Sequence, residues 1–332
     1  MKKFLNNVDD IMNETLEGYT LANSQYLSLK EGTHNITRRK PKEQGKVKLV
    51  IGNGGGHEPG TPGQVGYGLY DLVSLGDVFA AQSGKRLFEA IKDIDDGSPV
   101  LLTIANHAGD VMNGNLAIRK AKKAGINIEG VIHWDDVASA PKECPEERRG
   151  VAGIFFPTKI AGAAAEEGAS LEKCVELFNE TRDMTRSVAI ALGGGTHPQT
   201  GLPIMQLPDD RANIGAGAHG EGGAKDIPFS TSKEMVGEAM EMLVDDMPYV
   251  AGDEVLLLVT GMGGTTMMEM SIVYRDACKY LESRGISVYS GTAADMVTTQ
   301  EACGVTLSIC KVNDELKRLW DAPCSCPIYS NM

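Results

Sequence analysis

Two glycine-rich loops each carry a histidine whose imidazole could bind or attack a small ligand. His57 lies in GGGHEPG and His219 lies in GAHGEGG, so both rings are flanked by residues without side chains and by bare backbone N–H groups. A neutral imidazole can add to an electrophilic carbonyl carbon. Taken singly, either histidine has the alternative role of capping its own loop through one hydrogen bond.

A third loop supplies a carboxylate. Asp110 ends NHAGD, which follows an apolar run at 100–104 and precedes a helical stretch. A carboxylate beside a substrate hydroxyl can act as a general base, whereas capping the following helix is the structural alternative. The three loops together offer two imidazoles, a carboxylate and backbone donors, a set suited to a small polar or phosphorylated ligand.

Apolar runs place these loops at the ends of strands. VKLVI at 47–51 precedes the His57 loop, VLLTI at 100–104 precedes NHAGD, and INIEGVIH at 126–133 follows a helical segment. Continuous apolar runs that alternate with helical patterns are typical of buried parallel strands in βαβ units. Since ligands bind beyond the carboxyl ends of such strands, we expect an α/β fold with a site at this edge.

The second half of the chain alternates in the same way. It contains apolar runs at 187–192, 254–259, 286–289 and 305–311, helical patterns at 159–186, 232–244 and 265–284, and the loops GGGTHPQTG, IGAGAHGEGG and GMGGTT. Ser170 is the expected N-cap of a helix within 159–186. The length of 332 residues predicts two domains, at about 150 residues per domain. We place them at residues 1–186 and 187–332.

Composition excludes several classes of protein. Lys and Arg number 32 against 45 Asp and Glu, a net charge of −13, which opposes non-specific binding to phosphate backbones. No apolar run approaches the roughly 20 residues of a membrane-spanning helix, and MKKFLNNVDDIMNE lacks the apolar core of a secretion signal. The seven cysteines have no regular spacing, as expected of reduced thiols. We expect a cytoplasmic protein that binds neither nucleic acid nor membrane.

Motifs for other nucleotide and hydrolase chemistries fail. The sequence has no G-x-x-x-x-G-K-[ST] loop and no G-x-S-x-G elbow, which argues against a Walker-type nucleotide pocket and an α/β-hydrolase. Gly215, Gly217 and Gly220 satisfy G-x-G-x-x-G, but the following AKDIPF contains proline and opens no helix. A dinucleotide site needs a strand before this motif and a helix after it, so we reject that function.

In these loops the chain resembles the substrate-binding subunit of dihydroxyacetone kinases. Members of that family carry, in order, a GHEP loop, an N-x-x-GD loop, an RRGVA segment, a G-x-HGE-x-G loop and a WDAP ending. This sequence has GGGHEP at 54–59, NHAGD at 106–110, RRGVAG at 148–153, GAHGEGG at 217–223 and LWDAP at 319–323. The likeness extends from MKKFLNNV to Pro323, and five ordered motifs make it specific.

The resemblance implies a fold and a chemistry. The fold is α/β with two domains, the first a three-layer α/β/α sandwich on a mostly parallel sheet and the second a mixed sheet with helices; the assembly is a homodimer. By the family pattern, His219 binds the substrate's carbonyl carbon covalently as a hemiaminal. Asp110 is then the general base for the terminal hydroxyl, and His57 hydrogen-bonds the substrate near that hydroxyl.

The surrounding loops complete the predicted site. The expected substrate-binding residues are Asn53, Gly54, Gly55, Gly56, Ala105 and Asn106. A covalent bond to the carbonyl fixes a small hydrated sugar for in-line transfer and rejects glycerol, which has no carbonyl. The resemblance also implies that the phosphoryl donor is a separate subunit holding ATP or ADP with Mg²⁺. We therefore expect no cofactor and no metal on this chain.

Several residues depart from the family pattern near this site. Asn53 and Gly55 stand where relatives have glycine and serine, and Ala105 replaces a lysine that lies near the substrate. GMGGTTMMEM and TAADMVTTQEACG also replace two common segments. Dihydroxyacetone is the default substrate of the predicted kinase subunit, with a sugar such as erythrulose as competitor. The alternatives are a ketose-binding coactivator or sensor without turnover, and a carbonyl-binding protein without a partner.

Overall fold

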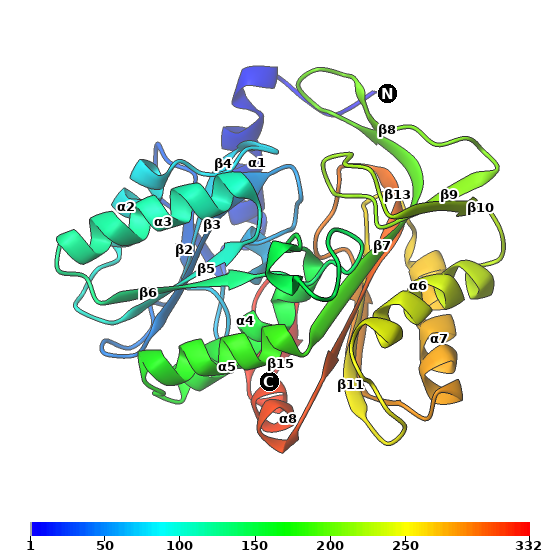
Figure 1. The fold of residues 1–332 in the computed structure, drawn as a ribbon. Helices are drawn as coiled ribbons and strands as arrows, with labels where there is room; N and C mark the ends of the chain where they lie inside the picture. Colours follow the sequence, from blue (N-terminus) through cyan, green and yellow to red (C-terminus); the bar gives the residue numbers. More distant parts are fainter. Residues whose placement is uncertain (1) are drawn as a thin grey trace. The chain divides into compact units, whose positions relative to one another are not determined.

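The computed structural model describes residues 2–332, which form two compact units, each built on its own sheet (Figure 1). The parallel-sheet unit comprises Phe4–His133, Phe155–Glu180 and Glu315–Met332. The mixed-sheet unit comprises Trp134–Ile154 and Thr181–Asp314, together with Lys2 and Lys3. The division into residues 1–186 and 187–332 stays a prediction; the compact units themselves alternate along the chain.

The parallel-sheet unit contains a six-stranded sheet in the order β1-β2-β4-β3-β5-β6. Its strands are β1 (Leu27–Leu29), β2 (Asn35–Arg38), β3 (Lys48–Gly55), β4 (Leu72–Val78), β5 (Val100–Ala105) and β6 (Ile128–His133). β4, β3, β5 and β6 are parallel, and β1 and β2 add an antiparallel edge. The predicted, mostly parallel sheet is therefore confirmed.

Helices and short elements surround this sheet. The helices are α1 (Ile11–Ala22), α2 (Gly84–Asp93), α3 (Ala108–Lys123), α4 (Phe155–Glu166), α5 (Leu171–Asp183) and α8 (Asp314–Asp321). The 3-10 turns η1 (Val8–Asp10) and η2 (Pro62–Gln64) and the small ladder β14 (Cys324–Ser325) with β15 (Ser330–Asn331) complete the unit. The predicted N-cap of α5 is present, since Ser170 Oγ accepts a hydrogen bond from Lys173 N–H at 3.3 Å.

Helices cover both faces of the six-stranded sheet. α2 and α3 bury an apolar cluster on one face, which includes Leu102 of β5. Successive strand residues point to opposite faces, so Thr103 points away from that cluster. Its hydroxyl lies 2.8 Å from Tyr70 Oη, which lies 3.0 Å from Thr158 Oγ1 of α4. α4 therefore packs on the second face, and this unit has the three predicted layers.

The mixed-sheet unit has a seven-stranded sheet in the order β10-β9-β7-β13-β11-β12, with β8 paired to β7. Its elements are the strands β7 (Thr185–Thr196), β8 (Pro203–Met205), β9 (Arg211–Ile214), β10 (Lys225–Pro228), β11 (Glu254–Gly261), β12 (Ser287–Ala294) and β13 (Ala302–Lys311), the helices α6 (Ser232–Asp246) and α7 (Met267–Ser283), and the turns η3 (Pro145–Glu147) and η4 (Ala152–Ile154). β11 and β12 are parallel, and the other neighbours are antiparallel, as predicted for a mixed sheet.

Two amphipathic helices supply the core of the mixed-sheet unit. α6 and α7 lie side by side and bury their apolar faces against the sheet (Figure 1). Each helix begins with a capping box, in which Thr231 pairs with Glu234 and Thr266 with Glu269. This box satisfies free N–H groups of the first turn, and it explains why the helix expected from residue 265 begins at Met267.

Pairing extends two strands beyond their apolar runs. β3 continues to Gly55 because β4 pairs with its glycine segment. β7 continues to Thr196 because β13 pairs with Gly193 and Gly194 and β8 pairs with Gly194 and Thr196. In the sequence these glycines indicate loops, since they lack the side chains that mark a strand. Within residues 2–332, no helix combines the length and apolar character required to span a bilayer.

Candidate active site

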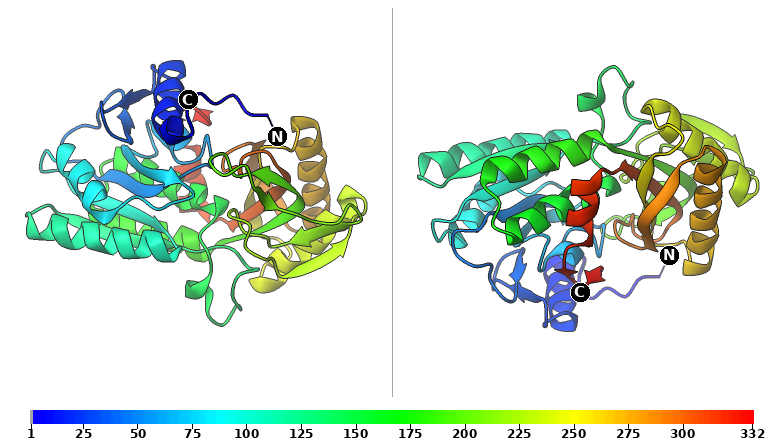
Figure 2. Two further views of the ribbon diagram at one scale, coloured as in Figure 1. Left: turned by 90° about the horizontal axis from the view of Figure 1, so that it is seen from above. Right: turned by 90° about the horizontal axis from the view of Figure 1, so that it is seen from below.

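β9 and β10 lie at one edge of the seven-stranded sheet (yellow-green in Figure 2). The loop that joins them carries His219. The strands form an antiparallel hairpin, which confirms that this G-x-G-x-x-G segment has no helix after it. Gly217 N–H donates to the carbonyl of Glu221 at 2.9 Å, and Gly220 N–H donates to the carbonyl of Gly217 at 3.1 Å. The loop is thus closed by its own backbone.

Gly220 permits the sharp turn after His219. Its φ is +84°, and a Cβ there would lie 2.3 Å from the carbonyl oxygen of Ile204. A side chain at residue 220 would be disfavoured both by that positive φ and by this close approach. The glycine beside His219 therefore has a structural reason, besides the room for a ligand that the sequence suggested.

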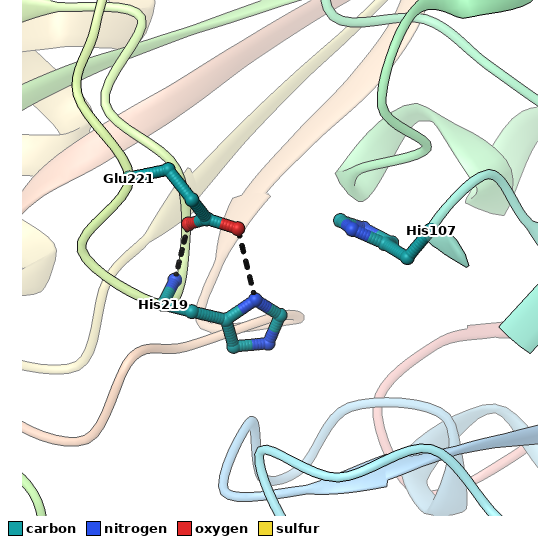
Figure 3. A group of neighbouring side chains, drawn as sticks. All are labelled: His107, His219 and Glu221. Atoms are coloured by element: carbon teal, nitrogen blue, oxygen red, sulfur yellow. Dashed lines mark hydrogen bonds and ion pairs between the residues drawn. The ribbon is translucent and has the colours of Figure 1, made fainter. Parts of the chain in front are cut away.

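Glu221 holds His219 through both carboxylate oxygens (Figure 3). Oε2 accepts the backbone N–H of His219 at 2.9 Å, and Oε1 lies 3.1 Å from Nδ1. The side chains of His219 and Glu221 are 33% and 40% exposed. The ring is therefore fixed on one side and partly exposed, and its second nitrogen points away from Glu221 (Figure 3).

Electrostatics select one tautomer of this imidazole. Burial opposes ionisation of Glu221, but the hydrogen bonds from His219 outweigh it and lower the pKa of Glu221 to about 2. At neutral pH the carboxylate can only accept hydrogen bonds, so Nδ1 must carry the proton. The neutral ring then has its lone pair on Nε2, the atom that a nucleophilic attack requires.

The other predicted residues lie at the carboxyl edge of the parallel sheet. β3 and β5 are adjacent parallel strands, with Ile51 opposite Thr103. The loop after β3 carries His57, and the loop after β5 carries Asn106 and Asp110. The structure therefore brings these loops to one edge of the parallel-sheet unit, the position expected for ligand binding in such sheets.

His57 is half-buried beside Phe79, with the ring centroids 5.1 Å apart. Phe79 N–H donates to the carbonyl of Gly55 at 2.9 Å, and Phe79 has a positive φ of 55°, which is rare outside glycine. A Cβ on Gly56 would lie 2.7 Å from the Phe79 ring. Phe79 thus supports the His57 loop, a role that sequence reasoning missed because no local pattern marks the strained residue.

Two of the loop's predicted backbone donors already have acceptors. Gly54 N–H donates to Asn53 Oδ1 at 2.8 Å, and Gly56 N–H donates to Glu58 Oε1 at 2.9 Å. These bonds order the loop through its own side chains. A substrate oxygen at either N–H would share the donor with, or replace, that acceptor.

Asp110 lies in the first turn of α3 and is half-buried. The N-cap of α3 is His107, so the alternative interpretation of Asp110 as the cap is wrong. The error has a simple cause, because the helix begins directly after the loop and takes Gly109 and Asp110 into its first turn. A carboxylate here is favoured by the helix dipole. Ala105 ends β5 as a buried residue, and Asn106 N–H donates to the carbonyl of His133 at 2.9 Å.

A signal for Glu221 was present in the sequence. It stands two residues after His219 in HGE, a spacing that a tight loop can close into a side-chain pair. The paired contact itself depends on the loop geometry. His219 belongs to the mixed-sheet unit, whereas His57 and Asp110 belong to the parallel-sheet unit, so their joint action is a matter of the proposed function.

Comparison with known proteins gives the same family as these loops. The family model described as the Dak1 domain matches residues 17–328. The chain is 36% identical over 315 residues to the dihydroxyacetone-binding subunit of PTS-dependent dihydroxyacetone kinase 1 from Listeria innocua, covering 95% of each chain. It is also 32% identical to D-erythrulose kinase from Mycolicibacterium smegmatis, covering 99% of this chain and 56% of that enzyme.

Solved structures agree with the fold. The dihydroxyacetone kinase of C. freundii superposes with a TM-score of 0.91 at 26% identity, over 99% of this chain and 60% of that one. A dihydroxyacetone kinase operon co-activator superposes with a TM-score of 0.88 at 28% identity, over 96% and 97% of the two chains. The two sheets thus define an α/β protein with the fold of the kinase's substrate-binding part. The chain belongs to the dihydroxyacetone and erythrulose kinase family of phosphotransferases, through its Dak1 domain.

Proposed function

We propose that this chain is the substrate-binding subunit of a dihydroxyacetone-type kinase. It binds a short hydroxy-ketone or hydroxy-aldehyde covalently on His219, and it acts as a homodimer in the cytoplasm. A partner subunit supplies the phosphoryl group from ATP or ADP with Mg²⁺. The observation that carries the proposal is the Glu221 carboxylate on His219 Nδ1 at 3.1 Å, because it leaves Nε2 as the nucleophile.

Covalent capture follows from the tautomer. The Nε2 lone pair forms a bond to the carbonyl carbon as the C=O π bond opens, and the carbonyl oxygen takes a proton from solvent. The ring becomes an imidazolium, whose positive charge is stabilised by the adjacent Glu221 carboxylate. Glycerol has no carbonyl and cannot form this bond, so capture selects ketoses and aldoses over polyols.

Transfer then depends on the parallel-sheet loops. In the proposed complex, the terminal hydroxyl of the captured sugar gives its proton to Asp110 as its oxygen attacks the phosphoryl group. His57 donates a hydrogen bond near that oxygen. General-base assistance of this kind contributes roughly 10²–10⁴-fold to a rate, and the covalent bond adds the advantage of fixed orientation.

The likeness to erythrulose kinases supports erythrulose as a second candidate substrate beside dihydroxyacetone. D-erythrulose kinase matches almost all of this chain, and Ala105 stands where the family pattern has a lysine. An alanine leaves more room than a lysine and removes a charged donor. Dihydroxyacetone remains the default substrate, and erythrulose is the competitor with one further hydroxymethylene group.

A ligand-responsive coactivator is the second candidate function. The solved operon co-activator covers nearly the whole chain at a TM-score of 0.88, and a sensor needs only carbonyl capture. The retained Asp110 and His57 favour the kinase, because capture alone requires neither a base nor a hydroxyl-binding imidazole.

One assay separates the two functions. The full chain is mixed with a nucleotide-binding kinase subunit, ATP-Mg²⁺ and a panel of dihydroxyacetone, D- and L-erythrulose, glyceraldehyde and glycerol. A phosphorylated sugar, absent with glycerol and with His219→Ala, supports the kinase. Capture of [2-¹³C]dihydroxyacetone, seen as conversion of the ketone carbon to a tetrahedral one, without phosphorylated product from any sugar, would favour the coactivator.

A further inference from the structure

Arg149 ties the His219 loop to a buried carboxylate. Its Nε donates to Asp136 Oδ2 at 3.0 Å, and its Nη2 lies 2.7 Å from the same oxygen. Nη2 also donates to the carbonyl of Gly215 at 2.8 Å. The side chains of Asp136 and Arg149 are 5% and 16% exposed. Since Gly215 begins the His219 loop, Arg149 joins the base of that loop to a fixed point in the same unit.

The carboxylate end of this contact is rigid. Asp136 forms a bridge with Ser187 of β7, and Val137 N–H donates to the carbonyl of Ser187 at 3.0 Å. Ala138 N–H donates to Asp136 Oδ1 at 3.0 Å. The sheet therefore holds the backbone of Asp136, and the Ala138 N–H orients one of its carboxylate oxygens. Asp136 thus serves as a fixed anchor for the Arg149 guanidinium.

Nη1 of Arg149 lies near the carboxylate that holds His219, with the open space at Gly217 between them. A Cβ on Gly217 would lie 2.3 Å from Arg149 Nη1 and 2.2 Å from Glu221 Oε2. The two charged atoms can be no farther apart than the sum of these two distances, which falls within the ~4–6 Å over which opposite charges favour each other's ionised forms. The missing side chain of Gly217 is what gives both groups this space.

We infer that Arg149 is a positioning residue for His219, acting through Glu221. From its anchor on Asp136 and Gly215, the guanidinium keeps the Glu221 carboxylate turned toward the loop, where it accepts the Nδ1 proton. The inference names a positioning group for the proposed capture reaction and in that respect rests on it. The tautomer that it sets is a property of the protein alone.

Such a group is needed because the Glu221 side chain is 40% exposed. An exposed carboxylate is well solvated and can rotate into water, and an isolated surface ion pair or hydrogen bond contributes little. A guanidinium held on a second, buried carboxylate offers a fixed positive charge on the protein side. It also bonds through a planar fork, which a lysine cannot reproduce.

The electrostatics of the anchor support a positioning role. Burial raises the pKa of Asp136 to about 6, aided by the neighbouring Asp135 and against the attraction of Arg149 and the Ala138 N–H. The free-energy cost of burying the ionised Asp136 carboxylate is therefore larger than its favourable interaction with Arg149. Buried ion pairs of this kind are weak contributors to stability, so specificity of geometry is the better explanation for the contact.

The experiment measures the tautomer of His219 in the ligand-free protein, by ¹⁵N NMR of the two ring nitrogens at neutral pH. The wild type should show Nδ1–H as the dominant form. Arg149→Met should give a mixture of tautomers and reduce the capture of [2-¹³C]dihydroxyacetone at least tenfold. Gly217→Ala tests the same point by another route, because its methyl group would occupy the space shared by Arg149 and Glu221.

The chain offers matched controls for both variants. Gly222 lies in the same loop, its φ is not positive, and a Cβ added there would meet no atom within 4 Å, so Gly222→Ala should keep the wild-type tautomer. Arg211 is exposed on β9, so Arg211→Met should do the same. Where Arg149→Met does not fold, Arg149→Lys replaces it, and we expect partial loss of the Nδ1–H form.

The outcomes separate the inference from the proposed function. A folded Arg149→Met, or its Arg149→Lys substitute, with the wild-type tautomer ratio overturns the role of Arg149, whatever the ligand results are. A wild type that holds the Nδ1–H form but never captures a ketone contradicts the capture reaction instead. Loss of the Nδ1–H form in Arg149→Met and Gly217→Ala, but not in the controls, supports the inference.

Discussion

Glu221 receives both the backbone N–H and the Nδ1 side of His219, at 2.9 and 3.1 Å. A carboxylate placed in this way does two things at once. It closes the loop around the histidine, and it decides which ring nitrogen carries the lone pair. The chemistry proposed for this protein depends on the second effect.

His219→Ala should abolish covalent capture. Glu221→Gln should weaken it by about 10- to 100-fold, by analogy with the carboxylates that orient metal-bound histidines. The glutamine keeps the size of the side chain but loses the charge that stabilises the imidazolium. Titration of each variant with [2-¹³C]dihydroxyacetone measures the tetrahedral carbon signal. Equal capture by wild type and Glu221→Gln would contradict the role of the carboxylate charge.

Asp110→Asn should leave capture unchanged and lower turnover by roughly 10²–10⁴-fold, since it removes only the proton acceptor. The measurement is phosphorylation of the sugar with the nucleotide-binding partner and saturating ATP-Mg²⁺, beside the capture titration on the same preparation. Undiminished turnover would exclude Asp110 as the base. Loss of capture together with turnover would instead assign Asp110 to ligand binding.

Gly215→Ala should destabilise the protein by about 2–4 kcal/mol, from a positive-φ strain of ~1–3 kcal/mol and an overpacked contact. Gly215 has a φ of +88°, and a Cβ there would lie 2.2 Å from Ala138 Cβ. Chemical denaturation measures the change in the free energy of unfolding. Gly222→Ala in the same loop meets no neighbour and should change it by less than about 0.5 kcal/mol; similar losses in both variants would refute the packing argument.

The pH dependence of stability should report on Asp136. Its pKa is raised by burial from 3.8 to about 6, so the folded state binds a proton more tightly than the unfolded state does. The associated stability is complete below pH 3.8 and is lost as the pH rises through about 6. By linkage this amounts to roughly 3 kcal/mol.

Urea unfolding of the wild type and of Asp136→Asn measures this effect. Both proteins are unfolded at pH values from about 3.5 to about 7, roughly half a unit apart. The free energy of unfolding of the wild type minus that of the variant should decrease as the pH rises. Subtraction removes the contributions of other groups, such as Glu221, whose lowered pKa acts in the opposite sense. A difference that is flat or rises with pH would show that Arg149 outweighs burial at Asp136.

The sequence by itself indicated which groups could bind a ligand and where several of the strands lie. Local apolar runs predicted β3, β5 and β11, and the loops that follow β3 and β5 carry His57 and Asp110. The reason is that strand burial and loop composition are properties of neighbouring residues. The glycines around His57 and His219 could also be recognised in the sequence, because a tight loop requires glycine at particular positions of its backbone.

Only the tertiary structure decided how the His219 loop is held. Asp136 lies 13 residues before Arg149 and Gly215 lies 66 residues after it, yet one guanidinium joins them. No local pattern marks such a contact, because it arises when separate segments pack on the same sheet and a buried charge must find a partner. The same holds for Phe79 beside His57 and for the extension of β3 through its glycines. The local sequence specifies which chemical groups a loop carries, whereas packing between distant segments specifies how those groups are oriented.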